Sequence, residues 1–331
     1  MPTDPPDDRS RAVRATIWTY LVCTFGLSSI FYFLIIRDGH LAAAHGLYVL
    51  GLMWCPGVAA FLTCAIRGKP VSSLGWKWSW RYQWISYLIP IGYALAAYLV
   101  VWVTGLGGVP NWKVVDALAK NGALSGLSRP ALLVVFVVST GTLGMITSIM
   151  SALGEEIGWR GLLVPELAKV TTFTKTALIS GAIWTMWHVP ILVFADYNNG
   201  TPVWYGLTCF AVLVMSISFL FAWMRLRSGS LLTGAFLHAS HNLVIQGILT
   251  PLTLDTGRTK YFIDEFGCAL AISALVVAYL VWRRRAEVSA AHAPDVVAGQ
   301  ADFAPVSSVP TLSSPTLSSV PTSSSVPPLS S

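Results

Sequence analysis

The sequence predicts an all-α membrane protein of about eight transmembrane helices, with both termini in the cytoplasm and a disordered C-terminal tail. Only 11% of the 331 residues are charged and 54% are hydrophobic, whereas about a quarter of the residues of a soluble globular protein are charged. Uncharged apolar runs of about 20 residues, long enough to cross a bilayer, recur along the chain. The composition excludes a water-soluble domain and a disordered regulator. A nucleic-acid binder is also excluded, because the net charge of +6 is spread over loops rather than gathered on one face.

Eight apolar runs are the candidate spans, and none of them contains Asp, Glu, Lys or Arg. Runs of this length without strict alternation favour helices over barrel strands, since only helices and closed barrels satisfy every backbone group in lipid. In chain order the predicted spans are Ala15–Ile36, Gly46–Ile66, Trp84–Val103, Ala131–Leu153, Ala177–Phe194, Val203–Met224, Leu231–Leu249 and Phe266–Trp282.

The distribution of Lys and Arg predicts the orientation, because cytoplasmic loops of membrane proteins carry the excess of basic residues. With the N-terminus inside and eight spans, 15 of the 21 basic residues lie on the cytoplasmic side and 6 on the other. An even number of spans therefore fits best, with both termini inside.

The spans and the composition of the chain together predict five segments. They are a cytoplasmic N-terminal segment (1–14), N-terminal transmembrane helices (15–130), a catalytic core (131–250), a last loop and transmembrane helix (251–285), and a disordered tail (286–331). The tail is rich in Ser and Pro and has no Lys or Arg, so it cannot bury a core.

Ionisable residues are costly within a membrane, so each one is a candidate functional residue. The fourth span continues into a segment with Glu155, Glu156 and Arg160, the fifth span holds His188, and the seventh holds the run from His238 to Asn242. On a helix, Glu155 and Glu156 point about 100° apart. Glu156 and Arg160 have the i, i+4 spacing of an ion pair, which leaves Glu155 free.

Helical spacing also relates the other candidates. His238 and Asn242 share one helix face, and Trp184 lies one turn before His188 and can pack against its ring. With about 1.5 Å rise per residue, His188 lies about 16 Å and His238 about 10 Å from the cytoplasmic start of its span. We therefore expect an acid, two imidazoles and an amide to meet beneath the cytoplasmic surface.

This set of groups suits peptide hydrolysis. A carboxylate beside an imidazole can activate water as a general base, and a second imidazole with an amide N–H can stabilise the oxyanion that forms at the carbonyl. The same acid and imidazoles (Glu155, His188 and His238) are also zinc-ligand types. Spacing alone does not choose between these two chemistries. Gly154, Gly158 and Gly161 indicate close helix packing or a kink rather than a phosphate-binding loop.

Three sequence motifs resemble those of the CPBP family, the CAAX proteases and bacteriocin-processing enzymes also called Abi. GEEIGWRG carries EExxxR, WTMWHVP carries WxxxH, and HASHN carries HxxxN, in that order on three predicted membrane helices. The resemblance covers about residues 131–249. The family includes the type II CAAX prenyl endopeptidases.

The resemblance implies roles for individual residues. Glu155 would activate water together with His188, while His238 and Asn242 would form the oxyanion site. Glu156 and Arg160 would support the site's geometry. Better-understood family members resemble glutamate-dependent hydrolases, so we prefer a site with no metal and no other cofactor, with zinc as the alternative. His241 stands between two motif positions; it receives no role and is interpreted as a hydrogen-bonded packing residue.

The resulting prediction is an intramembrane endopeptidase that cleaves near the cytoplasmic face. Its substrates would be peptides or membrane-anchored proteins, including lipidated ones, as in CAAX-type processing. A non-catalytic immunity or scaffolding protein of the same fold is one alternative. A small-solute transporter is another, although the chain shows no internal repeat of the kind common in transporters. If the source is a bacterium, as the resemblance suggests, the membrane is the cell (plasma) membrane.

Overall fold

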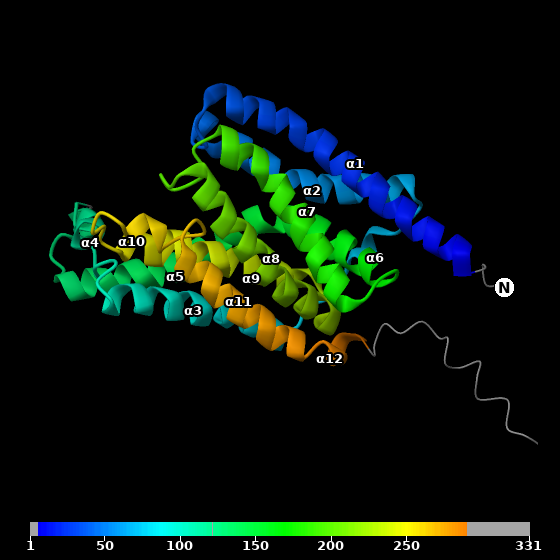
Figure 1. Ribbon diagram of the computed structural model, residues 1–331. Coiled ribbons are helices and arrows are strands. Elements are labelled where there is room, and N and C mark those ends of the chain that lie inside the picture. Colours follow the sequence, from blue (N-terminus) through cyan, green and yellow to red (C-terminus); the bar gives the residue numbers. More distant parts are fainter. Residues whose placement is uncertain (1–5, 121, 290–331) are drawn as a thin grey trace, which may run out of the picture. The chain divides into compact units, whose positions relative to one another are not determined.

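The computed structural model describes residues 6–120 and 122–289, all within one compact unit. These residues form helices that pack side by side (Figure 1). No β-strand occurs in this part of the chain, and its only isolated β-bridge pairs Gly108 with Leu254. The predicted all-α class is therefore confirmed.

Twelve α-helices, two π-helices and four short 3-10 helices make up the described part of the chain. The α-helices are α1 (Pro6–Asp38), α2 (Leu47–Ile66), α3 (Trp80–Val103), α4 (Trp112–Leu118), α5 (Arg129–Glu156), α6 (Val164–Ala168), α7 (Phe173–Phe194), α8 (Val203–Ser228), α9 (Leu231–Asn242), α10 (Thr250–Leu252), α11 (Cys268–Arg283) and α12 (Ala286–Ser289). The π-helices are η4 (Ile157–Leu163) and η5 (Leu243–Leu249). The 3-10 helices are η1 (Ala43–Gly46), η2 (Val71–Leu74), η3 (Gly122–Leu124) and η6 (Thr259–Tyr261).

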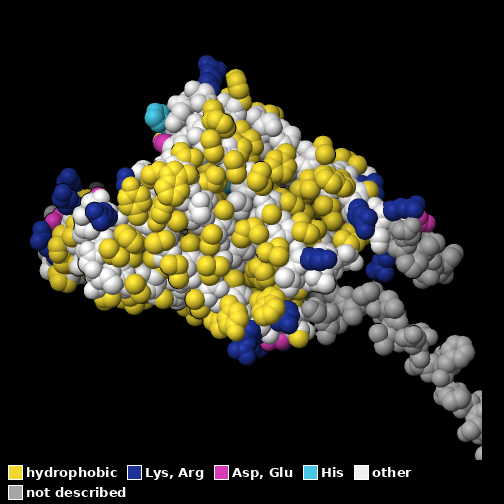
Figure 2. Space-filling model, viewed as in Figure 1, with side chains coloured by type: hydrophobic (Ala, Val, Ile, Leu, Met, Phe, Trp, Pro, Cys, Tyr) yellow, Lys and Arg dark blue, Asp and Glu magenta, His cyan; other side chains and the backbone are white. Residues whose placement is uncertain are grey.

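The eight predicted spans coincide with helices. Within the described residues, six helices are long and apolar enough to cross a membrane, and each contains one of the first six predicted spans. The seventh span is formed by α9 and η5 together, and the eighth by the shorter helix α11, which begins two residues later than predicted. The surface in Figure 2 is consistent with membrane-spanning helices, because apolar side chains cover its middle while Lys and Arg gather towards its ends.

Two of the fifteen basic residues assigned to the cytoplasmic side lie inside the bundle instead of on its surface. Arg160 and Arg225 are buried, and Arg225 donates from Nε to the backbone oxygen of Arg160 at 2.6 Å. Removing them leaves 13 basic residues against 6, so the direction of the bias is unchanged. The cytoplasmic location of both termini remains a prediction.

Local signals fix the starts of the two helices that carry the candidate histidines. The Thr172 hydroxyl caps α7 by accepting from the backbone N–H of Lys175 at 3.4 Å, and the Ser230 hydroxyl caps α9 by accepting from Leu232 at 3.2 Å. Both are N-cap residues that satisfy an otherwise unpaired helical N–H. Gly229 ends α8 in the left-handed region, at φ 69°, where glycine carries no steric cost.

The predicted close packing at Gly154 and Gly158 is confirmed. A Cβ at Gly154 would lie 2.7 Å from the Met53 backbone oxygen and 2.8 Å from the Trp54 Cα, and one at Gly158 would lie 2.6 Å from the Pro56 backbone oxygen. Helix α2 therefore approaches the end of α5 and the start of η4 so closely that only glycine fits. This contact fixes the height of Glu155 in the bundle.

Each π-helix begins at a motif. Helix η4 follows Glu156 and contains Arg160, the last residue of EExxxR, and η5 follows Asn242, the last residue of HxxxN. The fourth span is helical from Arg129 to Ala168 without a break, as predicted, but the sequence did not predict the π-helical turns. Such turns are rare and frequently occur at functional sites.

The tail was predicted to begin at residue 286. Its first four residues instead form α12, where the buried Val288 packs in an apolar cluster with Phe173 and Ala222. The remainder of the predicted tail, from residue 290, lies outside the described residues. The other predicted segment boundaries are not tested.

Candidate active site

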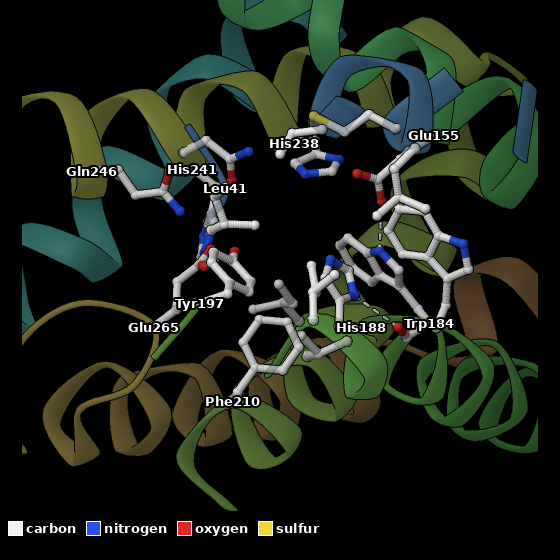
Figure 3. Close-up of a pocket in the computed structure, with 18 residues that line it drawn as sticks. Leu41, Glu155, Trp184, His188, Tyr197, Phe210, His238, His241, Gln246 and Glu265 are labelled. Carbon is white, nitrogen blue, oxygen red and sulfur yellow. Dashed lines mark hydrogen bonds and ion pairs between the residues drawn. The ribbon is translucent and has the colours of Figure 1, made fainter. Parts of the chain in front are cut away.

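A cavity of about 250 Å³ lies inside the bundle, and all four predicted catalytic residues line it. Glu155, His188, His238 and Asn242 come from α5, α7 and α9, and His241 also contributes to the wall. Figure 3 shows the labelled side chains arranged around the open centre of this cavity. The three motifs therefore meet at one place, as their helix positions predicted.

Glu155 is buried, and two indoles hold its carboxyl group. The Nε1–H of Trp184 donates to Oε2 at 2.8 Å, and the Nε1–H of Trp159 donates to the same oxygen at 3.2 Å. Both bonds end on Oε2, so Oε1 is left to meet a water or a substrate in the cavity. The sequence showed that Trp184 could pack near the site, but it did not predict either hydrogen bond.

Glu156 points away from the cavity, as the 100° separation of the two acids predicted. It forms the expected ion pair with Arg160, with 2.8 Å between Oε1 and Nη1. The Arg160 guanidinium lies between two aromatic rings, 4.2 Å from the ring centroid of Trp184 and 4.0 Å from that of Phe221. Buried charges of this kind require a paired partner, and cation–π contacts add to the pairing.

The contact of His188 with its own helix fixes its tautomer. Its Nδ1 lies 2.9 Å from the Trp184 backbone oxygen, which can only accept, so Nδ1 carries the hydrogen. In the neutral ring, Nε2 then has the free lone pair. The rings of Trp187 and Phe210 pack against the imidazole at centroid distances of 4.7 and 4.9 Å and fix its orientation. The predicted packing against Trp184 is also present, at 6.2 Å.

His238 bonds to the second acid of the motif. Its Nδ1 lies 3.0 Å from Oε1 of Glu156, so a carboxylate there accepts the Nδ1 hydrogen. In the neutral ring Nε2 again has a lone pair rather than a hydrogen. His238 can therefore donate to an oxyanion only as an imidazolium, which Glu156 would stabilise. The Trp184 ring packs against His238 at 5.3 Å and so contacts both histidines.

The sequence missed a second polar cluster in the same cavity. Glu265, in the connection before α11, accepts from the Tyr197 hydroxyl at 2.6 Å and lies 3.1 Å from Nε2 of His241. The Tyr93 hydroxyl bonds to Nδ1 of His241. His241 is hydrogen-bonded, as expected, but it also lines the cavity. No motif spacing links these residues; the only sequence signal was the acidic pair Asp264–Glu265 just before the last apolar run.

The indole that bonds to Glu155 lies halfway along its helix. Trp184 is 11 residues from the first residue of α7 and 10 from the last, which is about 16 and 15 Å along the helix. The position of the site beneath the cytoplasmic surface stays a prediction. The cavity lining also includes Leu41, Tyr197 and Glu265, which belong to the connections at the end that the charge bias assigns to the outside.

The zinc alternative named Glu155, His188 and His238 as ligands, and these three residues share the cavity. Among the described residues, no group of three or more His, Cys, Asp or Glu is arranged to hold a metal ion. The preference for a site without a metal stays a prediction.

Comparison with known proteins agrees with the motifs. Residues 131–244 match the family model described as "Type II CAAX prenyl endopeptidase Rce1-like". Over 137 residues the chain is 27% identical to "CAAX prenyl protease 2" of Methanococcus maripaludis, a match that covers 40% of this chain and 47% of that protein. The chain spans about half the length of this curated relative.

Residues 131–244 thus resemble the type II CAAX prenyl endopeptidases, as the three motifs predicted. The matched segment contains the motifs of α5, α7 and α9 and every residue of the predicted site. Together with the six long apolar helices, this match indicates a multi-pass integral membrane protein.

We predict a pH-dependent stability that arises at Asp264. Burial, assisted by the charge of Glu265, raises the pKa of Asp264 to about 7, against about 3.9 when unfolded. Between these values the folded state holds a proton that the unfolded state lacks. This contribution is fully present below about pH 4 and is lost as the pH rises through about 7.

The variant Asp264→Asn should therefore lose less thermal stability than the wild type between pH 5 and pH 8, measured as Tm in detergent. Asn tolerates the left-handed φ of 65° found here and keeps an acceptor for the Glu265 N–H. The exposed Asp255→Asn serves as the control and should follow the wild type. An equal fall of Tm in the wild type and Asp264→Asn would contradict the assignment.

Proposed function

We propose that this protein is an intramembrane endopeptidase in which Glu155 and His188 activate a water molecule. One observation carries the proposal: a buried carboxyl group faces a cavity beside an imidazole of fixed tautomer, with one oxygen held by two indole N–H groups. The family match over residues 131–244 supports the same class of reaction.

In the proposed reaction, water binds between Oε1 of Glu155 and Nε2 of His188. One of these groups takes a proton as the water oxygen attacks the carbonyl carbon of the scissile peptide bond. The proton then passes to the leaving nitrogen as the C–N bond breaks, giving a carboxylate and an amine. General acid–base catalysis of this kind contributes about 10²–10⁴-fold in rate.

The carbonyl oxygen becomes an oxyanion in this step and needs donors. Asn242 lines the cavity at the end of α9 and offers its amide N–H groups, and His238 lies one turn before it. Because Nδ1 of His238 faces Glu156, the Nε2–H needed for the oxyanion requires the imidazolium form. Glu156 is thus proposed to position His238 and to balance its charge, with Arg160 holding Glu156 in place.

The substrate is proposed to be a peptide or a membrane-anchored protein. The family description and the name of the archaeal relative both refer to CAAX prenyl substrates, in which the scissile bond follows a lipidated cysteine near a C-terminus. A cavity enclosed by membrane helices suits a substrate that is itself held in the bilayer. CAAX-type cleavage is therefore the first reaction to assay.

Replacing either member of the proposed base should abolish cleavage. We expect Glu155→Gln and His188→Ala to lower turnover of a quenched, lipidated C-terminal peptide by about 10²–10⁴-fold, the contribution of acid–base catalysis. Purified protein in detergent is assayed, and unchanged yield and Tm show that insertion and folding are intact. Glu166→Gln is the control, since Glu166 is buried on the same continuous helix but bonds to Lys69 and Lys169 instead of lining the cavity. Wild-type rates in both test variants would refute the proposed base.

The proposed reaction needs no metal ion. Exhaustive treatment with a chelator, followed by its removal, should leave turnover unchanged, because in the proposed step Glu155 and His188 alone hold and activate the water. Metal analysis of the same sample verifies the depletion. Activity that disappears with the metal and returns on adding zinc alone would overturn this part of the proposal.

A further inference from the structure

Glu265 forms one wall of the cavity, across from Glu155. In Figure 3, Glu265 and His241 lie across the open centre from Glu155, whereas the ring of Tyr197, which bonds to Glu265, packs 6.3 Å from the ring of His188. Glu265 is 5% exposed and His241 3%. The proposed water-activating step uses neither residue, although burying a carboxylate and an imidazole in a membrane protein is costly.

The hydrogen bonds around Glu265 define its charge. Its two oxygens accept from the Tyr197 hydroxyl and from Nε2 of His241, while the Tyr93 hydroxyl bonds to the other nitrogen of that ring. Burial acts to raise the pKa of Glu265, but the hydrogen bonds from His241 and Tyr197 oppose it, and the pKa lies below its ordinary value. With a neutral imidazole, this wall carries one negative charge.

The cavity lining has no fixed positive charge to offset this one. None of the described residues that line it is Lys or Arg, whereas Glu155 and Glu265 are both acidic. Three histidines line it as well, and each already bonds to a backbone oxygen or a carboxylate. An acceptor-rich wall of this kind complements a ligand that donates hydrogen bonds and carries positive charge.

The wall also lies beside one exposed part of the cavity lining. Most lining residues are buried, but Leu41, Val49, Met53, Tyr197 and Asn242 are partly exposed and Gln246 is exposed. Figure 3 shows Gln246, Leu41 and Tyr197 on the Glu265 side of the cavity, away from Glu155. A substrate chain that enters here passes Glu265 before its peptide bond reaches the proposed base.

We infer that Glu265, held by Tyr197 and His241, is a specificity subsite for a Lys or Arg side chain of the substrate near the scissile bond. The inference rests on the proposed function, since it assigns a subsite of the same cavity. It also predicts that a substrate's C-terminal carboxylate is not bound at this end of the cavity, because Glu265 would repel it.

The test uses pairs of quenched peptides. The two peptides of a pair differ at one position, which holds Lys in one peptide and the uncharged norleucine in the other. The pairs cover three positions on either side of the scissile bond. For at least one position, wild-type kcat/KM should favour Lys by about tenfold or more, the effect of one charge-assisted hydrogen bond. Glu265→Gln should reduce that ratio to near one, and Glu265→Asp, which keeps the charge, should retain most of it. Glu166→Gln should keep the wild-type ratio.

No preference for Lys in the wild type, or an equal preference in Glu265→Gln, overturns the inference while leaving the proposed function intact. If the wild type cleaves none of the peptides, the proposed function fails for this substrate class, and equilibrium binding of the same peptides to the Glu155→Ala variant then decides the inference. Tighter binding of a Lys peptide that is lost in the Glu155→Ala, Glu265→Gln double variant supports the subsite. Equal binding of Lys and norleucine peptides overturns it.

Discussion

The buried ion pair between Glu156 and Arg160 is the interaction on which the site depends. Arg160 has almost no contact with solvent, and its charge is balanced by Glu156 at 2.8 Å and by the faces of Trp184 and Phe221. Removing one partner of a buried pair leaves an uncompensated charge and costs about 3–5 kcal/mol. The pair therefore fixes the ring of Trp184, which in turn presents its N–H to Glu155.

The same pair joins helices that are distant in sequence. Glu156 ends α5 and bonds to His238 on α9, while Arg160 on η4 stacks on Trp184 of α7 and Phe221 of α8. Helix α9 approaches closely because a Cβ at Gly234 would lie 2.6 Å from Oε2 of Glu156. The acid, the two imidazoles and the amide are thus positioned by the Glu156–Arg160 pair, which lies on the side of α5 that faces away from the cavity.

The sequence predicted the local features and missed those that depend on packing between distant segments. Span length and charge predicted every long helix, and helical spacing predicted that Glu156 pairs with Arg160 while Glu155 faces elsewhere. The Trp184 hydrogen bond and the Glu265 wall were missed. Trp184 is hydrogen-bonded to Glu155 although the two are 29 residues apart in sequence, and Tyr197 is hydrogen-bonded to Glu265 although the two are 68 residues apart. No periodicity connects residues so far apart. The π-helices were missed because local propensity gives no signal for them.

The central claim is that the indole N–H of Trp184 orients the carboxyl group of Glu155 for water activation. The most direct measurement is steady-state cleavage by Trp184→Phe, which keeps an aromatic face for Arg160 and removes the N–H donor. The account predicts that kcat falls by about 10–10²-fold, the cost of a misplaced catalytic group, while KM and Tm stay near their wild-type values. A Trp184→Phe protein with wild-type kcat would contradict the account.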